Sequence, residues 1–416
     1  MKKTLQFSAC LATLATIPQA EADVIYSNLL DTAIPTTFDG VTINVNGGTL
    51  NPFFGGVAVA NNTLLQPLRA GTDGLATILN LSFGSTINSS SLYLSSGDGG
   101  SQDHLSNTFT AGQEGYIGFK LNGTNYGWMR VIFTDNTGGA MVKDWAYDNS
   151  GSGISVGGIQ QVGQNVILSS AFTLGSVLAN SGGTTNLVKN SVGTNTLTAT
   201  STYTGTTTVN AGKMVMGTSA AHTFATSGVT VASAATLGGS GTIAGNLVLN
   251  AESSSGAKDG GKLAPGNDPG VLTASGTTTF NTGSIFAWTI DTDTVTPGRG
   301  TEYAGLNTTS VSGTDAVFQI VTSDSEGFGD NFWETNHTWS DIFKDAAGSE
   351  SLGNDWLSMF SSFAFSNGTS TISAPTNGSF TWTNSGNTLS WTAVPEPTAP
   401  LGGLLIAVGL LRRRRA

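Results

Sequence analysis

Short strand-like fragments recur through the middle of the chain, and they constrain the fold more than any other feature. Each has three or four residues rich in Thr, Val and Leu, and Gly or Asn turns separate them at intervals of about ten to twenty residues. Strands this short cannot bury an apolar face alone, so we expect residues 161–293 to stack as coils of a parallel β-helix. The fragments are residues 196–198, 207–209, 214–216, 229–231, 247–249 and 271–273.

The composition agrees with a chain of strands and turns. The 416 residues include 56 Gly, and only 10% of them are charged. Helical bundles and coiled coils need far more Ala, Glu, Lys and Arg, so we exclude them. The formal net charge of −11 argues against a nucleic-acid partner, which requires a basic face.

The first 22 residues have the three parts of a secretory signal peptide. The basic start, the apolar run and the small-residue cleavage site are Lys2 with Lys3, residues 5–17, and Ala20 with Ala22. We therefore predict cleavage by signal peptidase before Asp23 and export of the protein. Cys10, the chain's one cysteine, lies inside this leader, where lipidation is the alternative to simple removal. The mature chain then has no disulfide and no cysteine metal ligand.

Residues 394–416 form a second targeting segment. A helix of the apolar residues 399–411 would rise only about 20 Å, which is short of a hydrocarbon core of ~30 Å. The four arginines after it favour a cytoplasmic end by the positive-inside rule. The motif and the arginines are Val394, Pro395, Glu396, Pro397, Arg412, Arg413, Arg414 and Arg415.

A Pro-Glu-Pro motif, a short apolar helix and an arginine cluster together resemble the PEP-CTERM sorting signal. The resemblance implies a Gram-negative bacterium that makes exopolysaccharide. It also implies transient anchoring in the inner membrane, cleavage by an exosortase, and delivery to the cell surface or extracellular matrix. The alternative is a tail anchor that is retained.

The order of residues within the central fragments identifies a repeat family more specifically than the spacing of the fragments does. Residues 202–212, 235–243 and 263–270 resemble the autotransporter-associated β-strand repeat. This resemblance implies a solenoid of the kind found on secreted bacterial proteins, in agreement with the expected β-helix.

The segment before the repeats, residues 23–160, predicts an antiparallel β-sandwich. Short alternating runs separated by Asn, Asp and Gly turns are typical of that architecture. The expected strands are residues 41–45, 78–83, 115–120, 128–134 and 141–147. Residues 126–131 and 144–148 resemble the N-terminal module of other PEP-CTERM proteins, a resemblance that implies no known activity.

The segment after the repeats, residues 294–393, predicts a β-rich cap on the open end of the solenoid. We expect a buried strand over residues 317–321 and a hairpin of residues 380–383 with 388–391. Thr338, with Asp341 three residues later, predicts the start of a short helix. A separate small domain is the alternative interpretation.

Residues suited to catalysis or metal binding are few. Ser155 lies in a Gly-x-Ser-x-Gly motif, which a Gly- and Ser-rich chain contains by chance and which needs an α/β sheet to act as a nucleophile elbow. The three histidines, His104, His222 and His337, are far apart and lack metal-ligand spacing. We predict no catalytic residue and no cofactor. Weak Ca²⁺ ligation is the alternative, by Asp291, Asp293, Asp324 and Glu326.

A sugar site is the most plausible binding site in the sequence. Sugar-binding sites use aromatic rings to stack on pyranose faces and polar side chains to bind hydroxyls. The first segment has suitable side chains in Trp128, Arg130, Trp145, Tyr147 and Asp148. On alternating strands, however, Trp and Tyr also serve as core residues.

These patterns predict an exported, non-enzymatic, all-β structural or adhesive protein. Its partners would be signal peptidase and exosortase during export, then exopolysaccharide or other matrix components. A repeat solenoid suits such a role because it offers many weak contacts in series. The alternatives are a lectin-like carbohydrate-binding protein and a polysaccharide lyase or hydrolase built on a β-helix.

Overall fold

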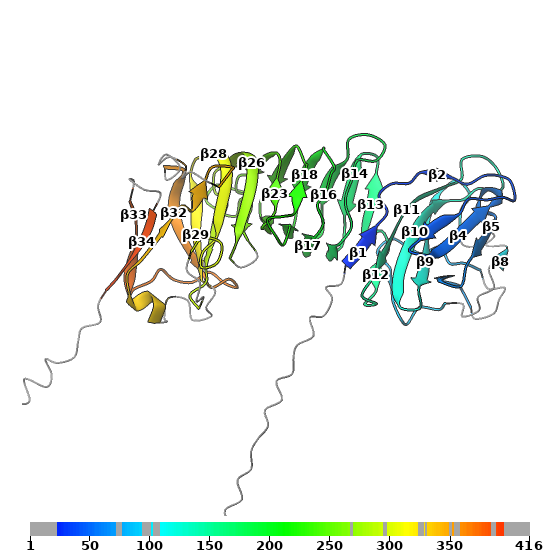
Figure 1. Ribbon diagram of the computed structural model, residues 1–416, viewed down its shortest axis with the longest axis horizontal. Helices are drawn as coiled ribbons and strands as arrows, with labels where there is room; N and C mark the ends of the chain where they lie inside the picture. Colours follow the sequence, from blue (N-terminus) through cyan, green and yellow to red (C-terminus); the bar gives the residue numbers. More distant parts are fainter. Residues whose placement is uncertain are drawn as a thin grey trace, which may run out of the picture.

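The computed structural model is an elongated all-β molecule whose strands stack along one axis (Figure 1). The part of the chain that it describes is residues 23–71, 77–93, 101–102, 109–266, 269–293, 298–322, 328, 331–348, 352, 358–383 and 388–394. In these residues no helix is long and apolar enough to cross a membrane. The expected signal peptide and sorting signal lie outside the described residues, apart from Asp23 and Val394.

Two long parallel sheets form the middle of the molecule. The first contains β15 (Phe172–Leu174), β17 (Thr194–Leu197), β19 (Lys213–Met216), β22 (Thr236–Gly239), β25 (Lys262–Pro265), β27 (Ile285–Ile290), β29 (Ala316–Thr322) and β32 (Phe360–Ser366). The second contains β13 (Ile159–Val162), β14 (Asn165–Leu168), β16 (Asn186–Lys189), β18 (Thr206–Val209), β20 (Thr223–Phe224), β21 (Gly228–Val231), β23 (Thr242–Ile243), β24 (Asn246–Leu249), β26 (Val271–Phe280), β28 (Gly305–Gly313) and β31 (Phe343–Lys344). The chain passes between the two sheets, and each circuit adds a parallel strand to both.

Alternation within each strand explains the core of this stack. Met214, Leu237 and Leu263 point inward from successive coils of the first sheet and are fully buried. Val209 and Leu249 do the same from the second sheet. Five of the six predicted fragments lie within strands, and residues 196–198 extend one residue past the end of β17. The expectation of an all-β fold is confirmed, and its middle consists of long parallel sheets. The winding is compatible with a β-helix.

Several N-terminal strands belong to the same sheet as the first of the two parallel sheets. Val24 of β1 (Asp23–Tyr26) pairs in parallel with Leu174 of β15, and on its other side it pairs antiparallel with Asp148 of β11 (Met141–Asp148). The sheet therefore continues across the expected boundary at residue 160. Its remaining strands are β2 (Thr32–Ala33), β6 (Leu65–Pro67), β9 (Glu114–Leu121) and β10 (Asn125–Ile132).

A second antiparallel sheet lies against these N-terminal strands. It contains β3 (Ile43–Val45), β4 (Gly48–Phe53), β5 (Ala58–Asn61) and β8 (Ser101–Gln102), and a separate pair joins β7 (Thr86–Ile87) to β12 (Ile154–Ser155). Leu50 and Val59 from this sheet share one buried cluster with Phe119 and Val131 from the other. The 3-10 turn η1 (Phe54–Gly56) follows β4. The expected strand over residues 78–83 is wrong, because only isolated bridges form at Ile78 and Asn80.

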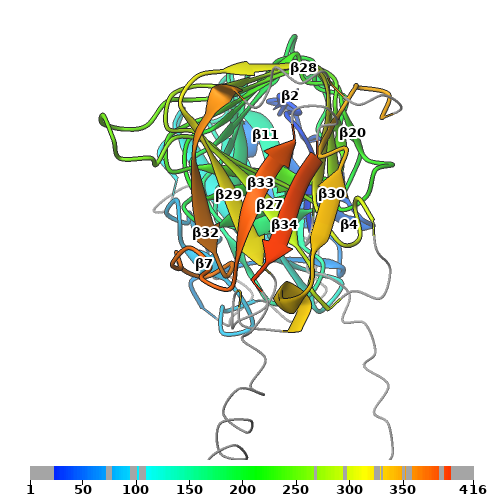
Figure 2. The same ribbon diagram turned by 90° about the vertical axis from the view of Figure 1, so that its left-hand side faces the viewer.

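At the C-terminal end the parallel stack continues past residue 293 and ends at β32. A three-stranded antiparallel sheet crosses this end in the end-on view (Figure 2). It contains β30 (His337–Ser340), β33 (Gly378–Thr383) and β34 (Thr388–Ala393), preceded by the 3-10 turn η2 (Asn331–Glu334). The predicted hairpin is confirmed as β33 with β34. The predicted helix is wrong, since Thr338 pairs with Ser390 in β30 and the adjacent Trp339 is buried.

Candidate functional site

The predicted sugar contacts lie on β10 and β11 and are largely covered. Trp128 is 0% exposed and packs edge-on against Tyr116, so its ring has no free face for a sugar. Tyr147 is also buried, and half-buried Trp145 stacks on it with 6.0 Å between the ring centroids. Asp148 is buried and accepts hydrogen bonds from Ser150. The alternative assignment as core residues therefore fits this geometry better than a sugar platform.

Arg130 belongs to a buried polar network at the junction with the stack. Its Nε and Nη2 atoms donate to the two carboxylate oxygens of Asp144, at 2.9 and 2.7 Å. The Tyr26 hydroxyl and the Gln161 amide also donate to Asp144, at 2.8 and 3.1 Å. Burial raises the pKa of the Asp144 carboxyl, while the Arg130 guanidinium favours its charged form. Because β1, β10, β11 and β13 all contribute, the network joins the N-terminal strands to the first coil.

The remaining candidate residues do not come together. Ser155 pairs with Thr86 in a two-strand ladder rather than on a strand-to-helix turn. His222 accepts a hydrogen bond from the Thr218 amide, and His337 stacks on Phe332 with 3.8 Å between ring centroids. His104, Asp324 and Glu326 lie outside the described residues, and Asp291 accepts from the amide of Asp293. Across the described residues, no group of three or more His, Cys, Asp or Glu side chains is placed to hold a metal ion.

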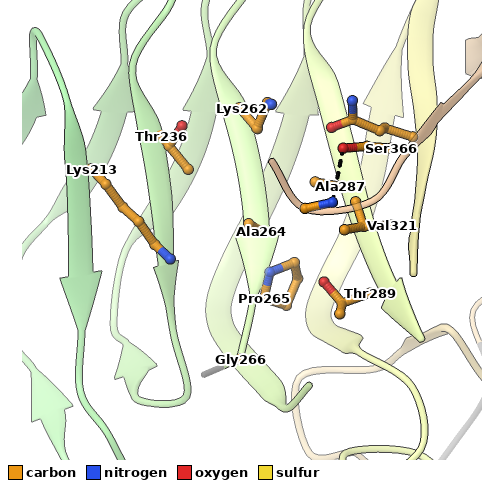
Figure 3. A pocket seen from close by; sticks show the side chains of 12 residues that line it. Lys213, Thr236, Lys262, Ala264, Pro265, Gly266, Ala287, Thr289, Val321 and Ser366 are labelled. Atoms are coloured by element: carbon orange, nitrogen blue, oxygen red, sulfur yellow. Dashed lines mark hydrogen bonds between the residues drawn. The ribbon is translucent and has the colours of Figure 1, made fainter. Parts of the chain in front are cut away.

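The outward face of the first parallel sheet carries a groove (Figure 3). Its floor contains the small residues Ala264 and Ala287, and Gly238 pairs with Ala264 on the neighbouring strand. A β-carbon at Gly238 would lie 3.3 Å from Cε of Lys213, so glycine leaves room for that side chain to lie over the sheet. The groove encloses about 480 Å³, and its polar lining side chains are Lys213, Thr236, Lys262, Thr289, Gln319 and Ser366.

Two lysines stand beside this floor in one register row. Lys213 pairs with Thr236, and Thr236 pairs with Lys262, so the two lysines lie two strands apart. Neither lysine forms an ion pair or hydrogen bond with a described residue through its ammonium group. Lys213 is exposed, whereas Lys262 is partly buried, and burial lowers the pKa of the Lys262 ammonium.

Gln319 is the third polar group of the groove. It lies on β29, opposite Ala287 of β27, and is only 9% exposed. Its side-chain amide forms no hydrogen bond with a described residue and lines the groove, where solvent can reach it. A second cavity of about 430 Å³ adjoins the first on the side where β22 and β25 begin. It shares Thr236, Lys262 and Gln319 with the first, and its lining adds Lys258 and Asp259.

The segment after β32 turns back over the sheet and borders the groove. Ser366 bridges Thr371, and the Ile372 amide donates to the Phe365 carbonyl at 3.0 Å. Within this turn the Ser366 hydroxyl accepts from the Gly368 amide at 3.1 Å, the contact dashed in Figure 3. In the same view the segment passes across the sheet beside Ser366 and Ala287. The groove therefore has a wall on its C-terminal side.

A cavity at the N-terminal junction provides a useful contrast. It encloses about 330 Å³ and is lined by Arg130, Glu114, Lys143 and Asp31. Both of its cations are paired, Arg130 with Asp144 and Glu114, and Lys143 with Asp31. By contrast, the two lysines that line the groove on the parallel sheet form no ion pair with a described residue. We therefore take this groove as the candidate site.

Sequence reasoning did not identify this site. Lys213 and Lys262 each directly precede a fragment singled out in the sequence and are the first residues of β19 and β25, which is the signal that could have revealed them. The two lysines align only because β22 pairs with both β19 and β25. The number of residues between β19 and β22 differs from the number between β22 and β25, so the spacing in the sequence does not predict the alignment. Nothing in the sequence marks Gln319 as a binding residue, because it lies within an apolar run that predicts a buried strand.

Comparison with known proteins gave no relative from which a function could be transferred. No family model matches the chain, and no curated protein matches it.

Proposed function

We propose that this protein is an exported, non-catalytic structural or adhesive element of a bacterial cell surface or exopolysaccharide matrix. The observation that carries the proposal is the parallel stack covered at both ends, by the N-terminal strands and by the β30–β34–β33 sheet. Covered ends give a solenoid of finite length that cannot grow by edge pairing. Such a rod displays a long outward face, along which the groove lies.

The same proposal assigns roles to the separate modules and to the two terminal segments. The two N-terminal sheets act as a β-sandwich module, and the stack is a β-helix of the autotransporter-associated repeat type. Residues 1–22 direct export, and residues 394–416 direct exosortase sorting after transient anchoring in the inner membrane of a Gram-negative bacterium. The signals in the sequence support these assignments, and the all-β parallel architecture is compatible with them.

A carbohydrate-binding role is the second candidate, and the groove favours it. The polar lining and small-residue floor suit a polymer that lies along the stack, rather than a sugar stacked on the N-terminal aromatics. Hydrolysis of glycosidic bonds generally uses two carboxyl groups, and the described residues that line the 480 Å³ groove include no Asp or Glu. The groove therefore supports binding better than it supports hydrolysis.

The test is intact-mass and C-terminal peptide mapping of the native protein, in separate envelope and extracellular fractions. We expect a mature form that begins at Asp23, ends near Pro395–Pro397, and is found outside the cell. A form that retains residues 401–416 and stays in the membrane would contradict the sorting and the matrix role together.

A further inference from the structure

We infer that the groove binds an extended acidic polysaccharide, a chain of uronic acid sugars whose carboxylates pair with Lys213 and Lys262. This inference rests on the proposed matrix role and names the ligand class that the site would take. Gln319 would bind sugar hydroxyls at the far side of the floor. The charge of the groove, the spacing of its lysines and the accessible amide of Gln319 favour such a ligand.

The charge of the groove is opposite to that of the molecule. The chain as a whole carries a formal net charge of −11, yet the described lining of the 480 Å³ groove has two lysines and no acid. The adjoining cavity adds one acid, Asp259, and one further lysine, Lys258, which pairs with Asp315. At physiological ionic strength charges farther apart than about 8 Å are largely screened, so the lining decides which ligands are attracted. An ammonium group that is partly buried without a counter-ion, as in Lys262, favours an anion that enters the groove.

The spacing of the lysines suits a polymer with repeated charges. Two strand separations place their backbones roughly 9–10 Å apart along the stack axis. This distance is comparable to a disaccharide unit of an extended glycan. Because the floor contains the small residues Ala264 and Ala287, a sugar chain can approach the sheet closely.

Gln319 supplies the second, independent observation. The Gln319 side-chain amide opens onto the groove and forms no hydrogen bond with a described residue, so both its donor and its acceptor are available to a ligand. A hydroxyl-rich ligand can satisfy both groups at once. Thr236 and Thr289 add hydroxyl groups along the same groove.

The position of the groove favours a glycan over a peptide. Extended peptides bind proteins of this type by adding a strand to a sheet edge, whereas this groove lies on the outward face. No aromatic side chain is found among the described lining residues, so neutral sugars lack a stacking surface here. Charge is then the main source of selectivity, and neutral glucans should bind weakly.

The experiment uses residues 23–394, which contain every described strand, and titrates them calorimetrically with oligogalacturonate. The groove variant is Lys213→Gln with Lys262→Gln, and the matched control is Lys120→Gln with Lys344→Gln, which changes the net charge equally outside the groove. We expect at least tenfold weaker binding for the groove variant and less than a twofold change for the control. Gln319→Leu should also weaken binding, and maltooligosaccharides should not bind. Circular dichroism and thermal denaturation verify that each variant is folded.

The outcomes that would overturn the inference are distinct. Equal binding by the groove variant and the control would remove the groove as the site. Polyglutamate binding as tight as oligogalacturonate would show a general polyanion site rather than a glycan site. A wild-type protein found in the matrix that fails to bind oligogalacturonate would end this inference and leave the proposed function standing. A protein that binds oligogalacturonate but stays in the cell membrane would contradict the proposed matrix role and leave the assignment of the groove as a glycan site standing.

Discussion

The two ends of the parallel stack are closed by different kinds of interaction. At the N-terminal end, β1 pairs with β15, and the polar network of Tyr26, Arg130 and Asp144 lies behind the junction. At the C-terminal end, Trp333, Trp339 and Trp391 pack together beneath the β30–β34–β33 sheet. Strand pairing continues through the first end, whereas an aromatic cluster covers the second.

This difference should give the two ends different sensitivities. A buried ion pair holds only while both charges are present, since one uncompensated charge is costly in the interior. An aromatic cluster depends on contact area and shape, so it responds to volume and little to pH. Changes of charge, pH and side-chain size should therefore affect the two ends unequally.

Alkaline pH should have the largest effect, and it should open the N-terminal end first. Burial raises the pKa of four tyrosines there, and Tyr93 and Tyr116 reach about 12. Tyr26 and Tyr147 are also raised, whereas Tyr303 is the one such group near the C-terminal end within the described residues. A folded-state pKa above the unfolded value near 10 stabilises the fold below pH 10. That stability is lost as the pH rises toward 12, by about 1.4 kcal/mol per pH unit for each tyrosine.

Brief proteolysis at a series of pH values, followed by mass mapping, locates the region that opens. Tyr116→Phe removes one titrating group and also its hydrogen bond to Gln160, so the slope against pH is the informative quantity. The slope should fall by about 1.4 kcal/mol per pH unit. First cleavage near the C-terminal end would contradict the assignment of pH sensitivity to the N-terminal strands.

Arg130→Met should destabilise the N-terminal end by about 3–5 kcal/mol, measured by urea denaturation. The substitution leaves the fully buried carboxylate of Asp144 without its cation. The double variant Arg130→Met with Asp144→Leu should recover part of the loss, because it removes the uncompensated charge. Recovery stays incomplete because the Tyr26 hydroxyl and the Gln161 backbone amide lose their acceptor. Lys143→Met is the control, since its pairing with exposed Asp31 is worth about 0–1 kcal/mol. Equal losses for Arg130→Met and Lys143→Met would show that the network does not hold the junction.

The same two ends show what the sequence could predict. The short fragments predicted the strands because alternation places residues such as Leu197 and Val209 inside. The expected end of the repeats at residue 293 was too early. Phe286 and Phe318 occupy inward positions in register with Leu263, so a change to larger side chains resembled a change of domain.

The candidate site was less predictable for a related reason. Which side chains share an outward row depends on coil length, and loops of unequal length separate the strands. Lys213 and Lys262 are far apart in sequence, and only the pairing of each with Thr236 brings them into one row. The predicted helix at Thr338 failed because pairing with β34 outweighs a local capping signal.

Trp391→Phe should destabilise the C-terminal end by about 1–3 kcal/mol and leave its pH dependence unchanged. The substitution keeps an aromatic ring but removes the indole donor, which bonds to the buried Trp333 carbonyl at 2.9 Å. Hydrogen exchange of peptides from β30, β33 and β34 measures the local loss. Phe38→Ala is the matched aromatic control, because Phe38 is 70% exposed and its loss should cost little. Faster exchange at β1 or β11 would show that the ends are coupled.

The smallest effect should come from the middle of the stack, where a buried polar side chain on β18 can be compared with an exposed one directly after it. On β18, Thr207 is buried and its hydroxyl lies 2.7 Å from that of Tyr203, while the exposed amide of nearby Asn210 donates to Asn190 at 2.9 Å. Thr207→Val should cost about 1–2 kcal/mol, because a buried hydroxyl loses its partner, and Asn210→Ala about 0.5 kcal/mol, because water replaces the amide. Urea denaturation of both variants measures the two values. Equal losses would mean that the polar rows outside the stack stabilise it as much as the core does, and the contrast between the ends would then need an explanation other than burial.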